Sequence, residues 1–240
     1  MIRVAVSGAA GRMGGRIISL IGQDKDLRLV VALERKGHKG IGDLIDDEKI
    51  TDDPELIKDA DCLVEFTTPE ATIEHLDIAH RFKKPTVIGT TGLSDEQKRR
   101  IKDISKEIPI VLAPNMSIGV NLLFGLVKDA AGKLAPDYTV NITEAHHIHK
   151  KDAPSGTAKR LAEIIKEASG KDVLDIKSIR ENEIVGDHKV IFEGSFDKLE
   201  LFHSAKTRDV FAKGAIEAAK FVVGKGPGLY DMQDVIESRE

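Results

Sequence analysis

Short apolar runs alternate with amphipathic stretches over the first half of the chain. Five runs rich in Val and Ile are too short and too uniformly apolar for half-exposed hairpins, which predicts strands buried on both faces of a parallel sheet. They are Ile2–Val6, Leu29–Leu33, Cys62–Phe66, Thr86–Ile88 and Ile110–Leu112. Apolar residues recur at helical spacing in Arg12–Gly22, Pro69–Phe82 and Ser94–Glu107. This alternation predicts an α/β fold with a doubly wound parallel sheet, which binds ligands at the carboxyl ends of its strands.

Local signals support these helix starts. Ser94 stands three residues before Gln97, the spacing of a capping box, in which each side chain bonds the other residue's backbone N–H. Pro69 and Pro54 suit the first position of a helix, where no N–H is needed.

The pattern changes after Asn115. A helix-like stretch leads through Pro136 into a segment of alternating apolar and polar residues, and fewer helices then separate the strands. This predicts an α+β second domain with a mixed or antiparallel sheet. Its expected helices and strands are Ile118–Ala131, Tyr138–His146, Gly156–Ala168, Ile176–Arg180, His188–Phe192 and Leu199–His203. A last helix, Asp209–Val223, and a Gly-rich segment over 224–230 follow.

Composition narrows the function classes. The 240 residues carry 36 basic and 40 acidic side chains, a formal charge of 36 − 40 = −4, and 10 aromatic residues (8 Phe and 2 Tyr), which argues against broad nucleic-acid binding. The single cysteine, Cys62, lies in an apolar run, so we expect a core residue and no disulfide framework. With no apolar leader or run of about 18 apolar residues, we expect a cytoplasmic protein with no membrane partner.

Glycines follow the first predicted strand and open the first predicted helix, in the segment Gly8-Ala9-Ala10-Gly11-Arg12-Met13-Gly14. Missing side chains let a phosphate approach the backbone, and a helix N-terminus offers free N–H groups and partial positive charge. The spacing is GxxGxxG rather than GxGxxG, but its place in the first βαβ unit favours a dinucleotide site. The alternative is a tight strand-to-helix turn with no ligand.

Residues at later strand ends extend this candidate site. Glu34 can accept hydrogen bonds from the adenosine ribose of NAD, whereas the adjacent Arg35 can pair with the 2′-phosphate of NADP, which predicts use of both cofactors. Without the glycine turn, a solvated charge cluster would explain this pair equally well. The turns Gly89–Gly92 and Ala113–Met116 fall at predicted carboxyl edges and are expected on the nicotinamide side.

A cationic segment joins the first strand of the second domain to its first helix. His146, His147 and His149 stand beside Lys150 and Lys151, and Ser155-Gly156-Thr157 then begins a helix. Imidazoles exchange protons near neutral pH, and helix N–H groups bind carboxylates, so an acid catalyst and an anion site are expected side by side. A metal site on the histidines lacks a third ligand at persuasive spacing, and a solvated turn would not explain three histidines.

The sequence resembles the 4-hydroxy-tetrahydrodipicolinate reductase (dihydrodipicolinate reductase) family. The resemblance spans nearly the whole chain in order, and its most specific segment is Glu-Ala-His-His-Ile-His-Lys-Lys-Asp-Ala-Pro-Ser-Gly-Thr at 144–157. The other matching segments are 8–14, 33–35, 65–70, 89–92, 113–121, 208–215 and 227–232.

The resemblance implies a Rossmann-like dinucleotide-binding domain, residues 1–117 plus 208–240, with an inserted substrate-binding and oligomerisation domain, residues 118–207, in a homotetramer. It implies that NADH or NADPH reduces 4-hydroxy-tetrahydrodipicolinate, a small dicarboxylate, to tetrahydrodipicolinate in the diaminopimelate route to lysine. Hydride transfer to the substrate ring would be followed by protonation of the enamine.

Residue roles follow from the same resemblance. His146 would be the proton donor and acceptor and Lys150 the proton donor. His147, Ser155, Gly156 and Thr157 would hold the substrate carboxylates, and no metal is implied. The implied cofactor contacts are Gly8, Ala9, Ala10, Gly11, Arg12, Met13, Glu34, Arg35, Gly89, Thr90, Thr91, Ala113, Pro114, Asn115 and Met116.

The chain departs from the family pattern in three places. Ile148 stands where Arg is common, Lys151 where a small or apolar residue is usual, and Glu65 where many members have Asp. Arg208 is a further residue expected near the cleft. The alternatives to a reductase of this substrate are a non-catalytic NAD(H)-binding regulatory module, a histidine metalloenzyme, and a reductase of another small carboxylate.

Overall fold

The computed structural model describes residues 1–134 and 137–239, which fall into two compact units. The first comprises Met1–Ser117 and Phe211–Glu240, and the second comprises Ile118–Val210. The chain passes from the first unit to the second after Ser117 and returns after Val210, inside the first turn of helix α6 (Asp209–Val222). The domain bounds implied by the resemblance, 117 and 207, remain a prediction. Pro136, expected between helix and strand, lies outside the described residues.

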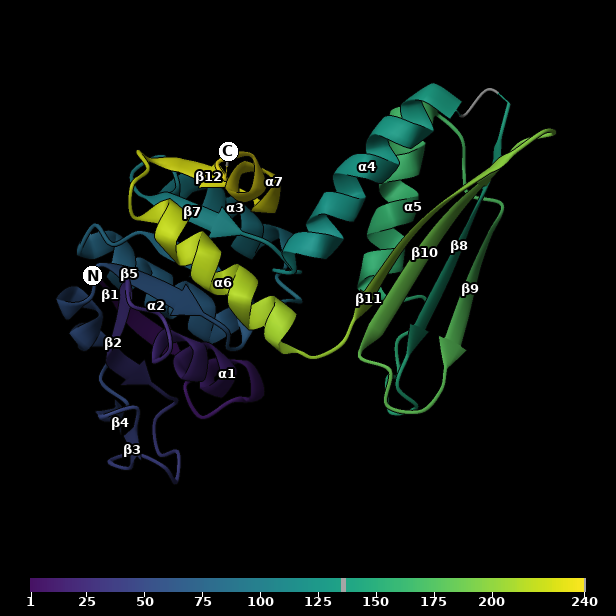
Figure 1. The fold of residues 1–240 in the computed structure, drawn as a ribbon. Helices are drawn as coiled ribbons and strands as arrows, with labels where there is room; N and C mark the ends of the chain where they lie inside the picture. Colours follow the sequence, from purple (N-terminus) through teal and green to yellow (C-terminus); the bar gives the residue numbers. More distant parts are fainter. Residues whose placement is uncertain (135–136, 240) are drawn as a thin grey trace. The chain divides into compact units, whose positions relative to one another are not determined.

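The first unit is built on an eight-stranded sheet (Figure 1). Its order is β12-β7-β6-β5-β1-β2-β4-β3, and every described pair is parallel except β3 with β4. The strands are β1 (Ile2–Ser7), β2 (Leu27–Leu33), β3 (Leu44–Ile45), β4 (Glu48–Thr51), β5 (Cys62–Glu65), β6 (Thr86–Ile88), β7 (Pro109–Leu112) and β12 (Gly228–Tyr230). The chain runs from β1 outward to β2 on one side and later to β5 on the other. The doubly wound sheet is therefore confirmed, and β1 stands at its topological switch point.

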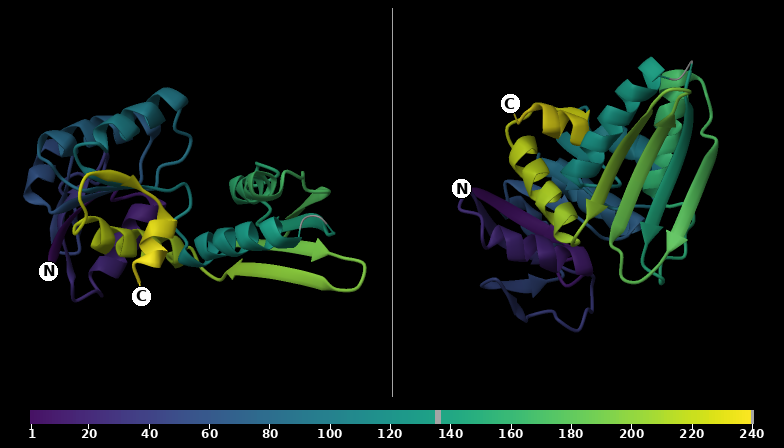
Figure 2. Two further views of the ribbon diagram at one scale, coloured as in Figure 1. Left: turned by 90° about the horizontal axis from the view of Figure 1, so that it is seen from above. Right: turned by 45° about the vertical axis from the view of Figure 1, so that its right-hand side comes forward.

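Helices cover both faces of this sheet (Figures 1 and 2). They are α1 (Arg12–Ile21), the 3₁₀ helix η1 (Pro54–Asp59), α2 (Pro69–Arg81), α3 (Asp95–Ile104), α6 and α7 (Met232–Glu237). The capping box is confirmed, since Ser94 N donates to Gln97 Oε1 at 2.8 Å and Gln97 N donates to Ser94 Oγ at 3.2 Å. Cys62 is fully buried, as expected, and burial raises the pKa of its thiol to about 12.

The second unit packs two helices on a four-stranded sheet. The elements are α4 (Ile118–Leu134), β8 (Thr139–His146), α5 (Gly156–Ser169), β9 (Asp175–Arg180), β10 (Gly186–Glu193) and β11 (Lys198–Ala205). The strand order is β11-β10-β8-β9, with β8 and β9 parallel and the other pairs antiparallel, which confirms a mixed sheet. Figure 2 shows α4 and α5 on one side of the strands, where Val140, Ile142, Val190 and Phe192 join the core with both helices.

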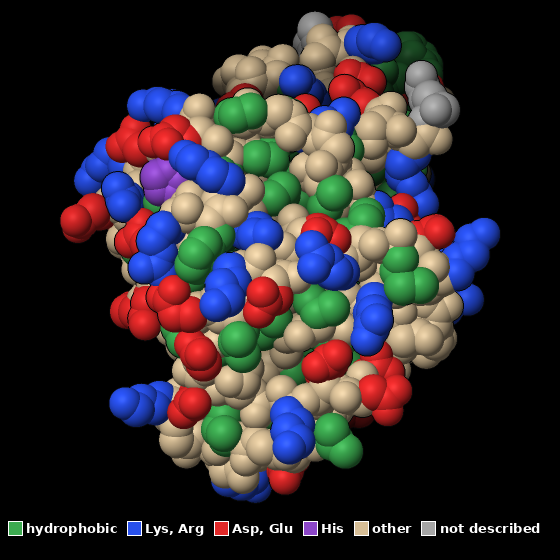
Figure 3. All heavy atoms as spheres, turned by 90° about the vertical axis from the view of Figure 1, so that its left-hand side faces the viewer, with side chains coloured by type: hydrophobic (Ala, Val, Ile, Leu, Met, Phe, Trp, Pro, Cys, Tyr) green, Lys and Arg blue, Asp and Glu red, His purple; other side chains and the backbone are tan. Residues whose placement is uncertain are grey.

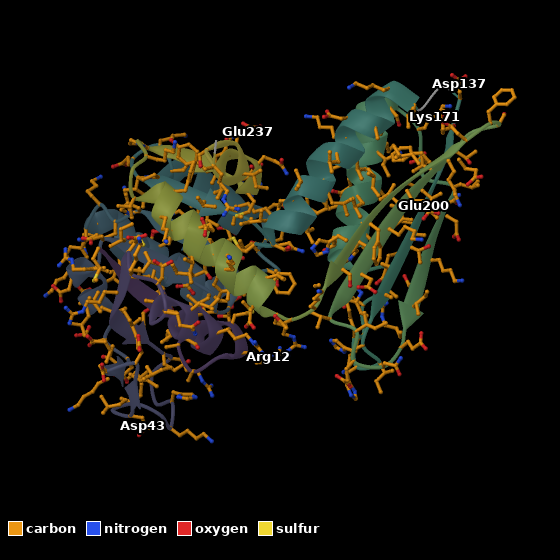
Figure 4. All side chains as sticks on the ribbon, in the orientation of Figure 1. Arg12, Asp43, Asp137, Lys171, Glu200 and Glu237 are labelled. Carbon is orange, nitrogen blue, oxygen red and sulfur yellow. The ribbon has the colours of Figure 1, made fainter. Side chains whose placement is uncertain are left out.

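Side chains alternate across this sheet, so the residues between those core positions face the other way. Thr143, Lys189, Ile191 and Phe202 lie on this second face, and Phe202 is 58% exposed. We call this surface, on β8 to β11, the open sheet face. Within the part of the chain that the structure describes, the unit places no helix on it. Figure 4 labels Glu200, which lies on β11 and alternates with the core position Leu201.

Candidate active site

The glycine turn between β1 and α1 requires its missing side chains. Gly8 has φ of 77°, and a Cβ there would stand 2.5 Å from the carbonyl oxygen of Phe66. A Cβ on Gly14 would stand 2.1 Å from the carbonyl oxygen of Gly8. Both distances are shorter than any side chain tolerates, so the turn is tight enough to hold the start of α1 against the end of β1.

The start of α1 has the properties of an anion site. Gly11 is the N-cap residue and gives no side-chain hydrogen bond to the first-turn amides, and the first turn holds no acidic residue. Its donors therefore point away from the helix without a carboxylate or hydroxyl partner from the cap. Arg12 begins the helix and is exposed (Figure 4).

Glu34 lies beside this turn, as the parallel sheet predicts. One of its carboxylate oxygens accepts a hydrogen bond from Ala10 N at 3.2 Å, and the other accepts one from Arg35 N at 2.9 Å. The amides of Gly8 and Ala9 both donate to the carbonyl oxygen of Leu33 at 3.0 Å. The end of β2 is therefore tied to the glycine turn through both backbone and side chain.

The later loops of the first unit are joined by buried hydroxyls. Thr90 is 4% exposed, and its Oγ1 accepts hydrogen bonds from Thr72 Oγ1 at 2.8 Å and from Thr67 N at 3.2 Å. Gly89 N donates to the carbonyl oxygen of Glu65 at 3.0 Å. Thr90 thus holds the loop after β6 against the loop after β5, which is a structural use of its side chain.

The 113–116 turn is also well ordered by local bonds. Ala113 N donates to the carbonyl oxygen of Ile88 at 3.1 Å, and Asn115 Oδ1 accepts a hydrogen bond from Ser117 N at 2.9 Å. Met116 is buried at 2% exposure. These bonds bring the end of β7 next to the end of β6, where the sequence predicts both turns to lie.

The second unit holds a buried carboxylate and imidazole pair. Glu144 and His146 are two residues apart on β8, so both side chains face the helix-covered side of the sheet. Glu144 Oε2 lies 2.5 Å from His146 Nδ1. Glu144 is fully buried and His146 is 8% exposed. Burial would raise the pKa of Glu144, but hydrogen bonds from Arg180, Ser178 and His146 outweigh it and the pKa lies below its usual value.

Burial also governs the two imidazoles of this cluster. Burial lowers the pKa of His146, and the hydrogen bond and charge of Glu144 only partly oppose this. Burial, followed by the charge of His146, lowers the pKa of His188 to about 3. The two rings lie 5.2 Å apart in an edge-to-face arrangement. Near neutral pH the His188 ring is therefore uncharged, and its Nδ1 has no partner among the described residues.

The loop after β8 carries the remaining cationic groups. Lys150 Nζ forms an ion pair with Asp152 Oδ1 at 2.9 Å, and the Lys150 side chain is 24% exposed. His147 Nδ1 is buried without a partner among the described residues, whereas His149 is exposed. Ile148, one of the departures from the family pattern, is 59% exposed and takes no part in this cluster.

Helix α5 begins directly after this loop. Ser155 is its N-cap residue, with an Oγ that accepts a hydrogen bond from Ala158 N at 3.2 Å and lies 3.3 Å from His188 Nε2. Its own N–H donates to Glu144 Oε1 at 3.4 Å. Ser155 is thus committed to local bonds, while Gly156 is exposed and a Cβ there would meet no atom within 4 Å. The helix start is open at Gly156.

Comparison with known proteins assigns these two constellations to one family. Residues 2–116 match the family described as dihydrodipicolinate reductase, N-terminus, and residues 119–236 match dihydrodipicolinate reductase, C-terminus. The chain belongs to the dihydrodipicolinate reductase family. It is 42% identical to the 4-hydroxy-tetrahydrodipicolinate reductases of Geotalea daltonii, over 98% of this chain and 99% of that one, and of Geotalea uraniireducens, over the full length of both.

Solved structures agree with this family assignment. The dipicolinate-bound dihydrodipicolinate reductase from Paenisporosarcina sp. TG-14 superposes with a TM-score of 0.82 and 27% identity, covering 96% of this chain and 97% of that chain. A probable dehydrogenase from Thermotoga maritima has a TM-score of 0.63 at 15% identity, over 99% of this chain and 93% of that one, which shows a shared fold. The expected family resemblance is therefore confirmed.

The expected residues gather in two places. The glycine turn, Glu34 and Arg35 lie together in the first unit, and His146, Lys150 and the start of α5 lie together in the second. Within residues 1–134 and 137–239, no group of three or more His, Cys, Asp or Glu side chains could hold a metal ion. No helix in the same residues is long and apolar enough to cross a membrane.

Three polar residues of these clusters were not singled out by their sequence pattern. Arg180 and His188 contact the Glu144, His146 and Ser155 group, and His75 contacts Glu65 in the first unit. Position on a strand could have indicated the first two, since Arg180 and His188 stand at ends of predicted strands. Nothing local in the amphipathic pattern of α2 marks His75.

Proposed function

We propose that this chain reduces 4-hydroxy-tetrahydrodipicolinate to tetrahydrodipicolinate with NADH or NADPH, in the diaminopimelate route to lysine. The observation that carries the proposal is the buried Glu144–His146 pair beside Lys150 and the open start of α5. It stands in a chain whose full length matches reductases of that substrate.

The first unit fits a dinucleotide. The glycine turn admits a phosphate close to the backbone, the start of α1 offers donors, and Glu34 can accept hydrogen bonds from a ribose. Arg35, adjacent and exposed, suits the 2′-phosphate of NADPH. The other proposed contacts come from residues 9–13, 89–91 and 113–116. When bound, the reduced nicotinamide supplies a hydride to the substrate ring.

The second unit supplies the proton and holds the carboxylates. The 4-hydroxyl group of the substrate leaves as water, and the unsaturated ring that results accepts the hydride. The enamine formed must then gain a proton, and His146 and the partly exposed Lys150 are the proposed donors. We propose that His147, Gly156 and Thr157 bind the substrate carboxylates, through an imidazole and the N–H groups at the start of α5. Ser155 contributes to this anion site as the N-cap residue of α5, because its hydroxyl accepts a hydrogen bond from Ala158 N and so holds the helix start.

The open sheet face supports self-association. A sheet face that carries Ile191 and a 58% exposed Phe202 among charged side chains is typical of a surface covered by another chain. We propose a homotetramer assembled through this face.

The proposal includes no nucleic-acid partner. Acidic and basic side chains are interspersed on the surface that Figure 3 shows, whereas a nucleic-acid-binding surface is typically basic. A cytoplasmic location suits the lone reduced thiol of Cys62.

The test is direct. The condensation product of aspartate semialdehyde and pyruvate is supplied with NADH or NADPH, and nicotinamide absorbance is followed. Substrate-dependent oxidation of the cofactor is expected. Cofactor binding without oxidation would instead indicate a regulatory module, and oxidation only with other carboxylates would indicate a different substrate.

A further inference from the structure

The carboxylate of Glu144 is held on every side. It is fully buried, and Arg180 donates to both of its oxygens, from Nη1 to Oε2 at 3.0 Å and from Nη2 to Oε1 at 2.8 Å. Ser155 N approaches Oε1 at 3.4 Å, and His146 Nδ1 approaches Oε2 at 2.5 Å. A fork of this kind satisfies both oxygens and fixes the plane of the carboxylate.

Strand pairing brings these residues together. β8 and β9 run parallel with Ser178 opposite Glu144 and Arg180 opposite His146. The Arg180 guanidinium therefore reaches back along β8 to the carboxylate, and its Nη2 also donates to the carbonyl oxygen of Asp152 at 2.5 Å. The same guanidinium thus ties the loop that carries Lys150 to the strand that carries His146.

Such a pair is not explained by stability alone. Removing two charges from water costs several kcal/mol per ion, and a buried ion pair often stabilises a fold no better than apolar residues of the same volume. Here the carboxylate of the Glu144–Arg180 pair also contacts the imidazole of His146, which the proposed reaction uses. Its Nδ1 faces the carboxylate, so the ring carries hydrogen on Nδ1 and keeps Nε2 for exchange with a ligand.

The far side of the ring is kept clear. Gly186 begins β10, and a Cβ there would stand 3.2 Å from His146 Nε2. His188, also on β10, has its ring against that of His146 and stays neutral near pH 7. The charged groups around His146 are Glu144 on its own strand, Arg180 on β9, and Lys150 paired with Asp152 in the loop.

We propose that Glu144 and Arg180 are positioning residues for proton transfer through His146. The carboxylate orients the imidazole with hydrogen on Nδ1, and the guanidinium keeps that carboxylate ionised and in place. This inference rests on the proposed function for its kinetic consequence, while the state of the His146 ring can be measured without any substrate.

The experiment is a pH titration of isotope-labelled histidines by NMR in the full chain. Glu144→Gln removes a negative charge, so the pKa of His146 should fall by about one unit or more and the Nδ1–H tautomer should lose its dominance. Arg180→Gln leaves the carboxylate without its cation, so the pKa of His146 should rise. Glu181→Gln, an exposed neighbour of Arg180, should leave the titration unchanged. Shifts of the same sign in both variants, or no shift, would overturn the proposal.

Kinetics separate positioning from folding. Glu144→Gln should lower kcat at least about tenfold with unchanged binding of NADH. The double variant with Glu144→Gln and Arg180→Gln leaves no unpaired buried charge, so its unfolding midpoint should recover towards wild type. If kcat stays low in that variant, positioning is supported. If kcat recovers with stability, the pair is purely structural and the proposal fails. Absence of turnover in the wild type would refute the proposed function and leave the NMR result intact.

Discussion

His75 on α2 and the fully buried Glu65 at the end of β5 form a pair, with 2.9 Å between His75 Nδ1 and Glu65 Oε2. Ser7 Oγ lies 3.0 Å from the same imidazole nitrogen, directly before the glycine turn. Thr67 Oγ1 donates to the other oxygen of Glu65. One carboxylate therefore links the ends of β1 and β5 to α2.

The pair predicts a loss of stability above neutral pH. Burial opposes the charged imidazole, but the hydrogen bond and charge of Glu65 outweigh it, so the pKa of His75 is raised. A histidine whose pKa is higher in the folded chain than in the unfolded chain stabilises the fold. This stabilisation is complete below the unfolded-state pKa of about 6.5, and it is lost as the pH rises through the folded-state pKa. His75→Gln should therefore lower the free energy of unfolding, measured in urea, most at pH 6 and least at pH 9. His149→Gln, an exposed histidine, is the control, and a pH-independent cost for His75→Gln would contradict the account.

His188 predicts the opposite trend on the acid side. Its pKa is lowered to about 3 by burial, so protonation favours the unfolded chain as the pH falls from about 6.5. Wild-type stability should decline through this window, and His188→Gln should show a shallower decline although it is less stable at pH 7. Unfolding midpoints at pH 7 and pH 5 measure this difference. An equal decline in both proteins would show that another group controls acid stability.

The proposed proton donors can be tested one at a time. His146→Ala or Lys150→Ala should lower kcat by ~10²–10⁴, because general acid catalysis contributes about that factor, while binding of NADH stays nearly intact. Lys151→Ala replaces an exposed lysine of the same loop and should retain activity. Steady-state kinetics and cofactor fluorescence measure the two quantities. Wild-type turnover in either donor variant would remove that residue from the mechanism.

Arg35 is expected to distinguish the two cofactors. Only NADPH carries the 2′-phosphate, and a hydrogen bond to a charged group contributes ~1.5–3 kcal/mol. Arg35→Ala should therefore weaken the binding of NADPH by about ten- to a hundredfold and change the binding of NADH little. Lys49→Ala, which removes an exposed cation from β4, is the matched control. Equal weakening of both cofactors would mean that Arg35 does not recognise the phosphate.

The open sheet face is tested by one substitution. Phe202→Glu places a charge where the proposed tetramer buries an aromatic ring, so the mass measured by light scattering should fall below that of four chains. Leu44→Glu alters another exposed apolar residue, in the first unit, and should leave the mass unchanged. A monomeric wild type, or a Phe202→Glu variant with the wild-type mass, would contradict assembly through this face.

Most of the fold could be predicted from the sequence pattern because most elements have their signals within their own residues. The runs at β1, β2 and β5 to β7 are apolar on both faces, and helices α2 and α3 begin at capping residues, so these elements could be assigned from their own residues. The strands β3, β4 and β12 were missed because they are two to four residues long and too polar or Gly-rich to show a period. Helix α7, only six residues long, was missed as well.

The site divides in the same way. His146, Lys150 and the glycine turn are adjacent in the chain to the elements that present them, so their places could be predicted. Arg180 reaches Glu144 only because β9 pairs with β8 after the whole of α5 has intervened. His75 likewise reaches Glu65 through the packing of a helix on a strand. Contacts set by pairing between distant segments leave no local period in the sequence.

The proposed reduction can be tested by following the two hydrogens that are added to the substrate. The wild-type chain is given the condensation product of aspartate semialdehyde and pyruvate with NADH deuterated at the transferred C4 position, and the product is analysed by mass spectrometry and NMR. The proposed reduction should give tetrahydrodipicolinate with one deuterium from the cofactor at the carbon that accepts the hydride. In deuterated water with ordinary NADH, that carbon should carry no deuterium, and the solvent deuterium should lie on the different ring carbon at which the enamine is protonated. Oxidation of the cofactor without deuterium in the product, or no oxidation at all, would contradict the proposed reduction.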